Sequence, residues 1–157
     1  MKTMGIALPM LLLVCTIGSM IPQDIPLKEM THEFIVPFPG VRKEKIFERV
    51  VKWLENNLRS PRPVIEKEDE EAGTIAGNGV TELRAEGDSA DVRLAFIITS
   101  DVRDGKARFR FINLEIFAGP ENGWETMPQD TTWHRPAQKK FSAIVTKLTE
   151  YVNRHLE

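Results

Sequence analysis

The chain has 157 residues, a length that suits one compact domain. Hydrophobic residues make up 41% of it and charged residues 28%, a composition typical of folded soluble proteins. The formal net charge is -2, so there is no basic excess to attract the phosphates of nucleic acid or an anionic lipid surface.

Residues 1–22 have the features of a secretory signal peptide. Lys2 supplies a positive charge at the start, and residues 6–17 form a mostly apolar stretch. This stretch is shorter than the roughly 20 apolar residues that span a bilayer. Gly18 and Ser19 supply the small residues at which signal peptides are cleaved. The pattern predicts an exported protein of the periplasm or the cell surface.

Cys15 is the single cysteine of the chain, and it lies inside this leader. A lipoprotein signal would lipidate such a cysteine, although Val14 stands where that signal normally has Gly, Ala or Ser. Three alternatives stay open: a cleaved signal peptide, a lipoprotein signal, and an uncleaved anchor or internal hydrophobic strand. After the leader we expect a tether at residues 23–31 and one domain at residues 32–157.

The first half of this domain predicts a strand, a helix and a pair of strands. Residues 32–38 are rich in β-forming side chains, and residues 42–58 place apolar side chains on one helical stripe. A Ser-Pro-Arg-Pro segment ends the helix, because proline cannot continue it. Residues 64–68 and 74–84 then predict two strands joined by an acidic turn at residues 69–73.

The strongest hairpin signal is the pair Asp104-Gly105, which favours a tight turn between strands at residues 91–102 and 106–118. The register that this turn sets brings oppositely charged and apolar side chains into pairs. The predicted pairs are Asp101 with Arg108, Thr99 with Arg110, Ile97 with Ile112, Ala95 with Leu114, and Ile98 with Phe111.

Residues 119–135 are predicted to form a long polar loop, after which Pro136 opens a final helix with a clear apolar stripe. The predicted order of elements is β-α-β-β-β-β-α. Two amphipathic helices on one face of a curved antiparallel sheet would bury both apolar stripes. We therefore predict an α+β fold with about five strands and two helices on one face.

Several motifs within residues 32–157 resemble those of a bacterial family of exported proteins, the domain of unknown function with a TBP-like fold. A helix containing Trp53 is followed by a Val-Ile strand, an acidic turn and a G-x-I-x-G-x-G strand from Gly73 to Gly79. The Arg-Phe-Arg-Phe strand at residues 108–111 fits the same pattern. The resemblance implies the TBP-like arrangement and agrees with the order of elements above. It implies no activity, and the family name describes a shape rather than DNA binding.

Two stretches have the composition of ligand sites but lack the spacing. The acidic run at residues 66–71 does not match a calcium loop and favours a solvated turn. Gly77-Asn78-Gly79 lacks the Lys-Ser/Thr of a phosphate loop, and we interpret it as a bulge or a crowded backbone.

The three histidines of the chain, His32, His134 and His155, show no metal-binding spacing. We therefore expect no cofactor and no metal site.

The predicted loop at residues 119–135 is the best candidate for a functional surface. Loops of this length in compact domains are often functional or mobile. Trp124, Trp133 and His134 would offer groups for recognition if they were exposed. The alternative, which we favour, is that both tryptophans fold back over an edge of the core. Trp53 lies on the apolar stripe of the first helix and is expected in the core.

A non-catalytic binding or accessory module of the cell envelope is the leading functional hypothesis. Its partner would be an envelope protein, a glycan or a small ligand, without nucleic acid, and with membrane contact only through the leader or a lipid anchor. A second hypothesis is an enzyme with His134, Glu125 and Asp130 as dispersed acid and base groups. A third is a helix-grip lipid carrier, which would need a large apolar cavity between the sheet and the last helix.

Overall fold

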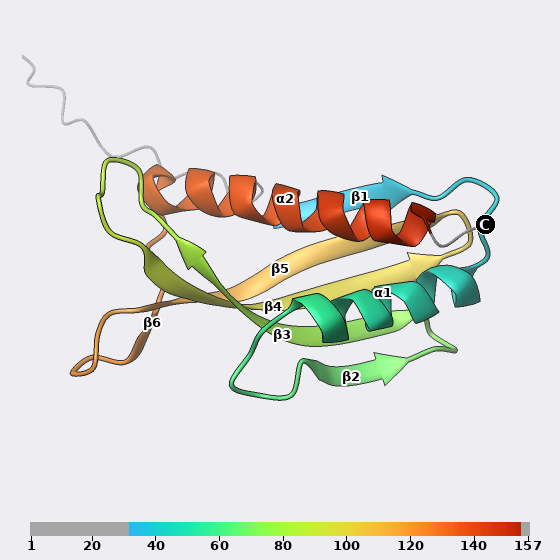
Figure 1. The fold of residues 1–157 in the computed structure, drawn as a ribbon, viewed down its shortest axis with the longest axis horizontal. Helices are drawn as coiled ribbons and strands as arrows, with labels where there is room; N and C mark the ends of the chain where they lie inside the picture. The colour runs from blue at the N-terminus through green and yellow to red at the C-terminus, as the bar shows by residue number, and fades with distance from the viewer. Residues whose placement is uncertain (1–31, 155–157) are drawn as a thin grey trace, which may run out of the picture.

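The computed structural model describes residues 32–154, in which two helices cover one face of a six-stranded antiparallel sheet (Figure 1). The predicted α+β class and the placing of both helices on one face are confirmed. The predicted leader at residues 1–22, with its Cys15, and the predicted tether at residues 23–31 lie outside the described residues, as does His155.

The elements follow one another as β1 (His32–Pro37), α1 (Lys43–Asn57), β2 (Ile65–Asp69), β3 (Thr74–Leu83), β4 (Val92–Arg103), β5 (Lys106–Phe117), β6 (Trp124–Thr126) and α2 (Thr131–Arg154). Across the sheet, five strands lie in the order β1-β5-β4-β3-β2. β6 pairs with the end of β5 that lies beyond β1, so β1 and β6 share one edge of the sheet.

The prediction for residues 119–135 is wrong in two respects. A sixth strand, β6, interrupts the expected loop, and α2 begins at Thr131 rather than at Pro136. Asp130 explains the early start of the helix. Its Oδ1 accepts hydrogen bonds from the backbone N–H groups of Thr132 (2.9 Å) and Trp133 (3.3 Å), which would otherwise lack partners at a helix N-terminus.

Pro136 lies inside α2, where proline normally breaks a helix. Proline has no N–H to donate to the carbonyl four residues earlier, which belongs to Thr132. That carbonyl instead accepts a hydrogen bond of 3.0 Å from the backbone N–H of Glu86, in the connection between β3 and β4. The helix can therefore pass through Pro136 because a distant segment supplies the missing donor.

The β4–β5 hairpin has the predicted register over most of its length. Four predicted pairs are confirmed: Asp101 with Arg108, Thr99 with Arg110, Ile97 with Ile112, and Ile98 with Phe111. The fifth is wrong, because Ala95 pairs with Glu115 instead of Leu114. Two residues of β5, Asn113 and Leu114, stand opposite the single residue Phe96, which is a β-bulge. Asn113 has φ 52°, a left-handed conformation that asparagine tolerates better than most residues.

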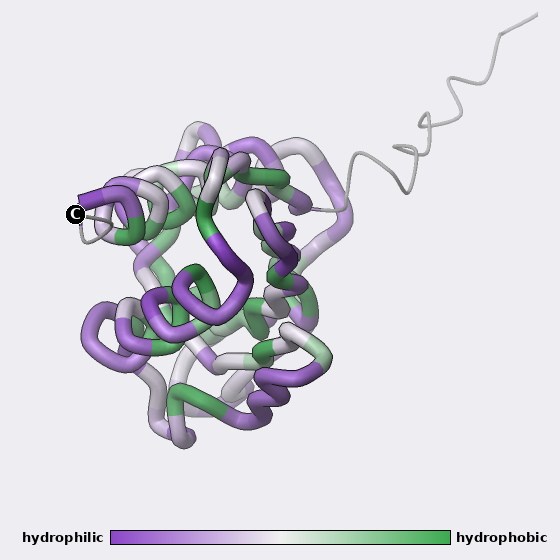
Figure 2. Tube along the Cα trace, turned by 90° about the vertical axis from the view of Figure 1, so that its right-hand side faces the viewer, coloured by the Kyte–Doolittle hydropathy of each residue, from purple (hydrophilic) through white to green (hydrophobic). Residues whose placement is uncertain are grey.

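The core lies between the helices and the inner face of the sheet, and hydrophilic segments dominate the periphery (Figure 2). Alternation along β4 turns Leu94, Phe96 and Ile98 inward, and all three are almost fully buried. Trp53 of α1 is only 5% exposed, as predicted. Phe141 of α2 is fully buried. Burial of each such side chain contributes about 1.5–3 kcal/mol relative to leaving it exposed in water.

Glycine in the middle of β3 allows close packing on the inner face. A Cβ atom on Gly79 would lie 2.4 Å from Cζ of Phe96, and one on Gly77 would lie 3.0 Å from the carbonyl oxygen of Val64. Real Cβ atoms essentially never approach another heavy atom as closely as 2.4 Å. The Gly77-Asn78-Gly79 segment is thus a crowded backbone that lets the Phe96 ring lie against the sheet.

Candidate functional site

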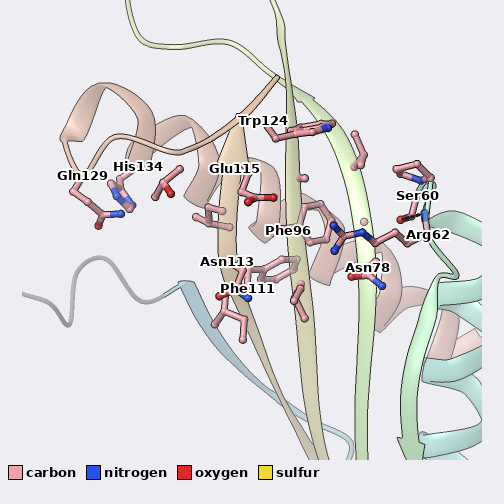
Figure 3. A pocket seen from close by; sticks show the side chains of 18 residues that line it. Ser60, Arg62, Asn78, Phe96, Phe111, Asn113, Glu115, Trp124, Gln129 and His134 are labelled. Atoms are coloured by element: carbon pink, nitrogen blue, oxygen red, sulfur yellow. Dashed lines mark hydrogen bonds between the residues drawn. The ribbon is translucent and has the colours of Figure 1, made fainter. Parts of the chain in front are cut away.

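The outer face of the sheet, opposite the helices, carries a groove with a volume of about 660 Å³ (Figure 3). The side chains that alternation turns toward this face and that line the groove are Asn78, Val80, Ala95, Ile97, Ile112 and Glu115. Ser60, Pro61 and Arg62 line it on the β3 side of the sheet, and Trp124 lines it on the β6 side. We call this hollow the outer groove.

The wall on the β3 side is the connection between α1 and β2. Its two ends are fastened to β3, because the backbone N–H of Val80 donates to the carbonyl of Arg59 (2.7 Å) and that of Asn78 donates to the carbonyl of Val64 (2.7 Å). The Asn78 side chain adds a third bond, from Nδ2 to the carbonyl of Pro63 (3.1 Å). These bonds hold the intervening turn beside the groove, and its Arg62 side chain extends toward the groove (Figure 3).

The opposite wall is Trp124 in β6, which is 37% exposed. Its indole ring meets Phe117 edge-on, with ring centroids 5.4 Å apart. The guanidinium of Arg93 lies 4.1 Å from the Phe117 centroid and 5.6 Å from that of Trp124. Aromatic and cation–π contacts of this kind fix the orientation of an exposed ring. Trp124 is therefore a positioned surface aromatic, whereas Trp133 is partly buried against the core.

A pair of histidines lies beside the groove, under the first turn of α2. His134 is 6% exposed and His32 of β1 is 1% exposed. Nδ1 of His134 lies 3.2 Å from Nε2 of His32, and Nδ1 of His32 lies 2.5 Å from Oε1 of Gln138. An amide oxygen only accepts, so the hydrogen of His32 belongs on Nδ1 and that of His134 also on Nδ1. Nε2 of His134 is then a buried acceptor without a partner within residues 32–154.

Both histidines are poor candidates for carrying a positive charge near neutral pH. Burial is the main cause that lowers the pKa of His32 below its ordinary value of 6.5, and the proximity of His134 lowers it further, against the hydrogen bond with Gln138. Burial also lowers the pKa of His134, against the opposing field of Asp130. The neutral pair satisfies the hydrogen-bond pattern described above, in which each bond has one donor and one acceptor.

The acid and base groups that the sequence analysis assigned to an enzyme do not form a catalytic arrangement. His134 bonds to another histidine rather than to a carboxylate. The Asp130 carboxylate caps α2. Glu125 is exposed, and its side chain forms no hydrogen bond or ion pair with any residue between 32 and 154. These three residues therefore hold different structural positions rather than one reaction centre.

Three further observations bear on the other predicted sites. The described part of the chain contains no group of three or more His, Cys, Asp or Glu residues that could hold a metal ion. Within the same residues, no helix has the length and apolarity to cross a membrane. Stacked rings of Phe111 and Phe141, with centroids 4.0 Å apart, occupy the space between the sheet and α2 where a helix-grip carrier would need its lipid cavity.

Sequence reasoning missed several residues of this region. Arg62 and Glu115 line the outer groove, Arg93 supports Trp124, and His32 bonds to His134. Of these residues, only His32 has a position that the sequence predicts, because it alternates with Phe34 and Val36 on the inward face of β1. The others are ordinary charged residues until the fold brings them together.

A protein-family model described as "Domain of unknown function (DUF4468) with TBP-like fold" matches residues 33–117. The chain belongs to this family. The resemblance inferred from the sequence motifs is thereby confirmed, together with the TBP-like fold. The matched DUF4468 region contains Arg62, Asn78 and Glu115, whereas Trp124 and His134 lie beyond its end. No curated protein matches the sequence.

Two solved structures share the DUF4468 fold with this chain. A DUF4468 family protein from Bacteroides ovatus superposes with a TM-score of 0.63 at 14% identity, over 78% of this chain and 85% of the other. A TBP-like protein from Parabacteroides distasonis superposes with a TM-score of 0.61 at 11% identity, over 78% and 92% of the two chains. Likeness at such identities establishes the common fold and carries no activity with it.

Proposed function

We propose that this DUF4468 protein is an exported, non-catalytic binding module of the bacterial cell envelope, and that it holds its ligand in the outer groove. The observation that carries the proposal is the groove itself, in which an apolar floor runs between the exposed Trp124 and the charged Arg62. Its volume of about 660 Å³ falls within the range of small-ligand sites, which is about 300–1,000 Å³.

The chemistry of the groove favours binding over catalysis. Trp124 supplies a large, positioned contact surface that loses little entropy when it is covered, which is typical of recognition sites. A nucleophile activated by an adjacent base would point to covalent chemistry. The groove lining has Ser60 and Thr126 as hydroxyl groups, and neither bonds to a histidine within residues 32–154. The leader at residues 1–22 supports the export part of the proposal.

Two measurements test the proposal. Expression of the full chain in a bacterium, followed by fractionation and mass spectrometry of the mature N-terminus, is expected to give an envelope protein cleaved after Gly18 or Ser19. A cytoplasmic protein with an intact residue 1 would contradict export. Recovery with lipid on Cys15 would support export by the lipoprotein route.

The binding part is tested by thermal-shift screening with short peptides, neutral oligosaccharides and small apolar compounds. A ligand of the outer groove is expected to stabilise the wild type and to lose most of its effect in Trp124→Ala. The matched control is Lys147→Ala on the exposed side of α2, which should respond like the wild type. A site in the outer groove would be contradicted if no compound stabilises the protein. It would also be contradicted if the stabilising compounds act equally on the wild type and on Trp124→Ala.

A further inference from the structure

β1 forms an edge of the sheet beside α2, and in the described part of the chain no strand pairs with its outer side (Figure 1). The edge strand on the opposite side, β2, is protected against pairing. Four of its five residues are charged, and its register shifts between Ile65 and Lys67. Charges and bulges of this kind normally keep sheet edges apart. β1 has an unbroken register with β5 and carries Phe34, Ile35 and Val36 in succession, so it is the edge that is open to another strand.

The hydrogen bonds of the sheet show which backbone groups of β1 are free. The N–H of Phe38 donates to the carbonyl of Gly105 (2.7 Å), so every second residue back from Phe38 also directs its backbone groups toward β5. The alternate residues Glu33, Ile35 and Pro37 therefore point theirs outward. Glu33 and Ile35 each present an N–H and a carbonyl, whereas Pro37 presents only a carbonyl because proline has no N–H.

The side chains of β1 also suit the approach of a further strand. Ile35, on the outer face, is 66% exposed, the highest value among the exposed large hydrophobic residues of the described chain. On the inner face, a hollow of about 510 Å³ lies between β1 and α2, and its lining includes Phe34, Val36, Val145 and Thr149. A strand added to this edge would cover Ile35 on one face and place its own inward side chains in this hollow on the other.

From these features we propose that β1 pairs in antiparallel orientation with β1 of a second copy of the chain, about a two-fold axis at Ile35. Ile35 then lies opposite Ile35 of the second copy, and the two residues exchange N–H to carbonyl hydrogen bonds. Glu33 lies opposite Pro37 of the second copy and donates its N–H to the proline carbonyl. This register asks for no donor from Pro37, so the proline ends the pairing without preventing it. The interface is separate from the outer groove and goes beyond the proposed binding function.

Charges on the outer face favour a second copy as the partner. Lys106 pairs with Pro37 in the sheet, so Lys106 of the second copy would lie two strands, about 10 Å, from Glu33, within reach of its long side chain. Both side chains are exposed, and neither takes part in an ion pair within the described residues. The arginines of β5 nearest to Glu33 pair with Asp101 instead. Within one copy, Glu33 lies four residues, about 13 Å, along the sheet from the row of Lys106, so the two-fold arrangement is what brings these charges together.

The dimer is tested by sedimentation velocity over a range of concentrations, with the protein recovered after expression of the full chain. The wild type is expected to show a concentration-dependent equilibrium between monomer and dimer. Ile35→Lys places like charges at the two-fold axis and removes an apolar contact, so it should weaken the dimer about tenfold or more. The matched control is Ala72→Lys, in the exposed turn after β2, which should leave the equilibrium unchanged. Both variants should keep the urea midpoint of the wild type, because both positions are exposed.

The register is tested by disulfide formation at single positions of β1. In a hydrogen-bonded antiparallel pair the Cα atoms are about 5.5 Å apart, which a disulfide can bridge. The experiment uses a Cys15→Ser background, which removes the single cysteine of the chain. Ile35→Cys should oxidise to a covalent dimer. Glu33→Cys should stay mostly monomeric, because the two copies of this position would be about 13 Å apart along the strands.

Three results would overturn the proposal. The first is a wild type that stays monomeric at every concentration, and the second is a dimer that Ile35→Lys does not weaken. The third is equal disulfide formation in Ile35→Cys and Glu33→Cys. If Ile35→Cys is instead cross-linked in cells to a different protein and forms no covalent homodimer, the edge accepts a foreign strand and the proposal of a second copy is likewise wrong. None of these results would affect the proposed ligand binding in the outer groove, which is tested through Trp124.

Discussion

Nε2 of His32 lies 3.2 Å from Nδ1 of His134, so that β1 and α2 are joined by a hydrogen bond between two histidines 102 residues apart in the chain. The imidazole rings are nearly parallel, with an interplanar angle of 18° and centroids 5.3 Å apart. The rings of His32 and Phe141 make a T-shaped contact, with centroids 5.1 Å apart. The bond between the two rings requires a neutral His32, because Nε2 of His32 must accept from Nδ1 of His134, and a charge on either ring would be buried.

The first prediction is that the domain loses stability as the pH falls below about 6.5. Burial holds the pKa of both His32 and His134 below 6.5 in the folded state, so the unfolded chain binds more protons in this range. The stabilising contribution is complete above pH 6.5 and is lost as the pH falls through the lowered folded-state values. Urea unfolding midpoints between pH 7.5 and 5 should show the decline.

The variant His32→Gln/His134→Gln provides the control for this pH dependence. It should be less stable than the wild type at pH 7.5 and should lose less stability on acidification to pH 5. Glu48 and Asp91, whose pKa values are lowered by hydrogen bonds to Lys52 and Arg84, titrate below this window. A decline of the same size in the double variant would rule out the histidine pair as its source.

Asp130 is predicted to act as a helix cap rather than as a catalytic acid or base. Asp130→Ala removes the acceptor for the N–H groups of Thr132 and Trp133 and should cost about 0.5–2 kcal/mol of unfolding free energy. Asp130→Asn keeps a side-chain oxygen and should stay within about 0.5 kcal/mol of the wild type. Urea denaturation measures both. Equal losses in the two variants would contradict the capping role.

Gly79→Ala is predicted to destabilise the domain, because its Cβ would lie 2.4 Å from the Phe96 ring. Overpacking of this kind costs about 1–3 kcal/mol. The smaller side chain in Gly79→Ala/Phe96→Leu should relieve the clash, so the double variant should be more stable than the sum of the two single losses. Thermal unfolding of the four proteins measures the coupling. If the stability losses of the two single variants simply add up in the double variant, contact with the Phe96 ring is not the reason why glycine is needed at position 79.

Asn113 is predicted to tolerate glycine but not a β-branched residue. Its φ of 52° at the β5 bulge suits Asn113→Gly, whose stability should lie within about 0.5 kcal/mol of the wild type. Asn113→Val should cost about 1–2 kcal/mol, because the left-handed conformation crowds a branched Cβ. The difference between the two urea midpoints is the readout. Equal stability of the two variants would show that the bulge relaxes to another conformation.

The sequence by itself was sufficient to predict most of the helices and strands and the α+β class of the fold. Alternation along residues 91–102 and the Asp104-Gly105 turn predicted the hairpin register as far as Ile97 and Ile112, because both signals are local. Helical periodicity placed Trp53 in the core for the same reason. The motifs that carry the family resemblance also lie within short segments, and the family match confirms the resemblance.

Other features of the fold and of the groove were decided only by the tertiary structure. The bulge at Asn113 moves Glu115 into the row of Ala95, and the Glu86 N–H allows α2 to include Pro136. The outer groove is lined by Arg62, Glu115 and Trp124, and the histidine bond joins the start of β1 to the first turn of α2. Each of these relationships depends on contacts between distant segments, which leave no periodic pattern in the sequence. The sequence therefore determined the framework of the fold, and packing between distant segments decided where a ligand could bind.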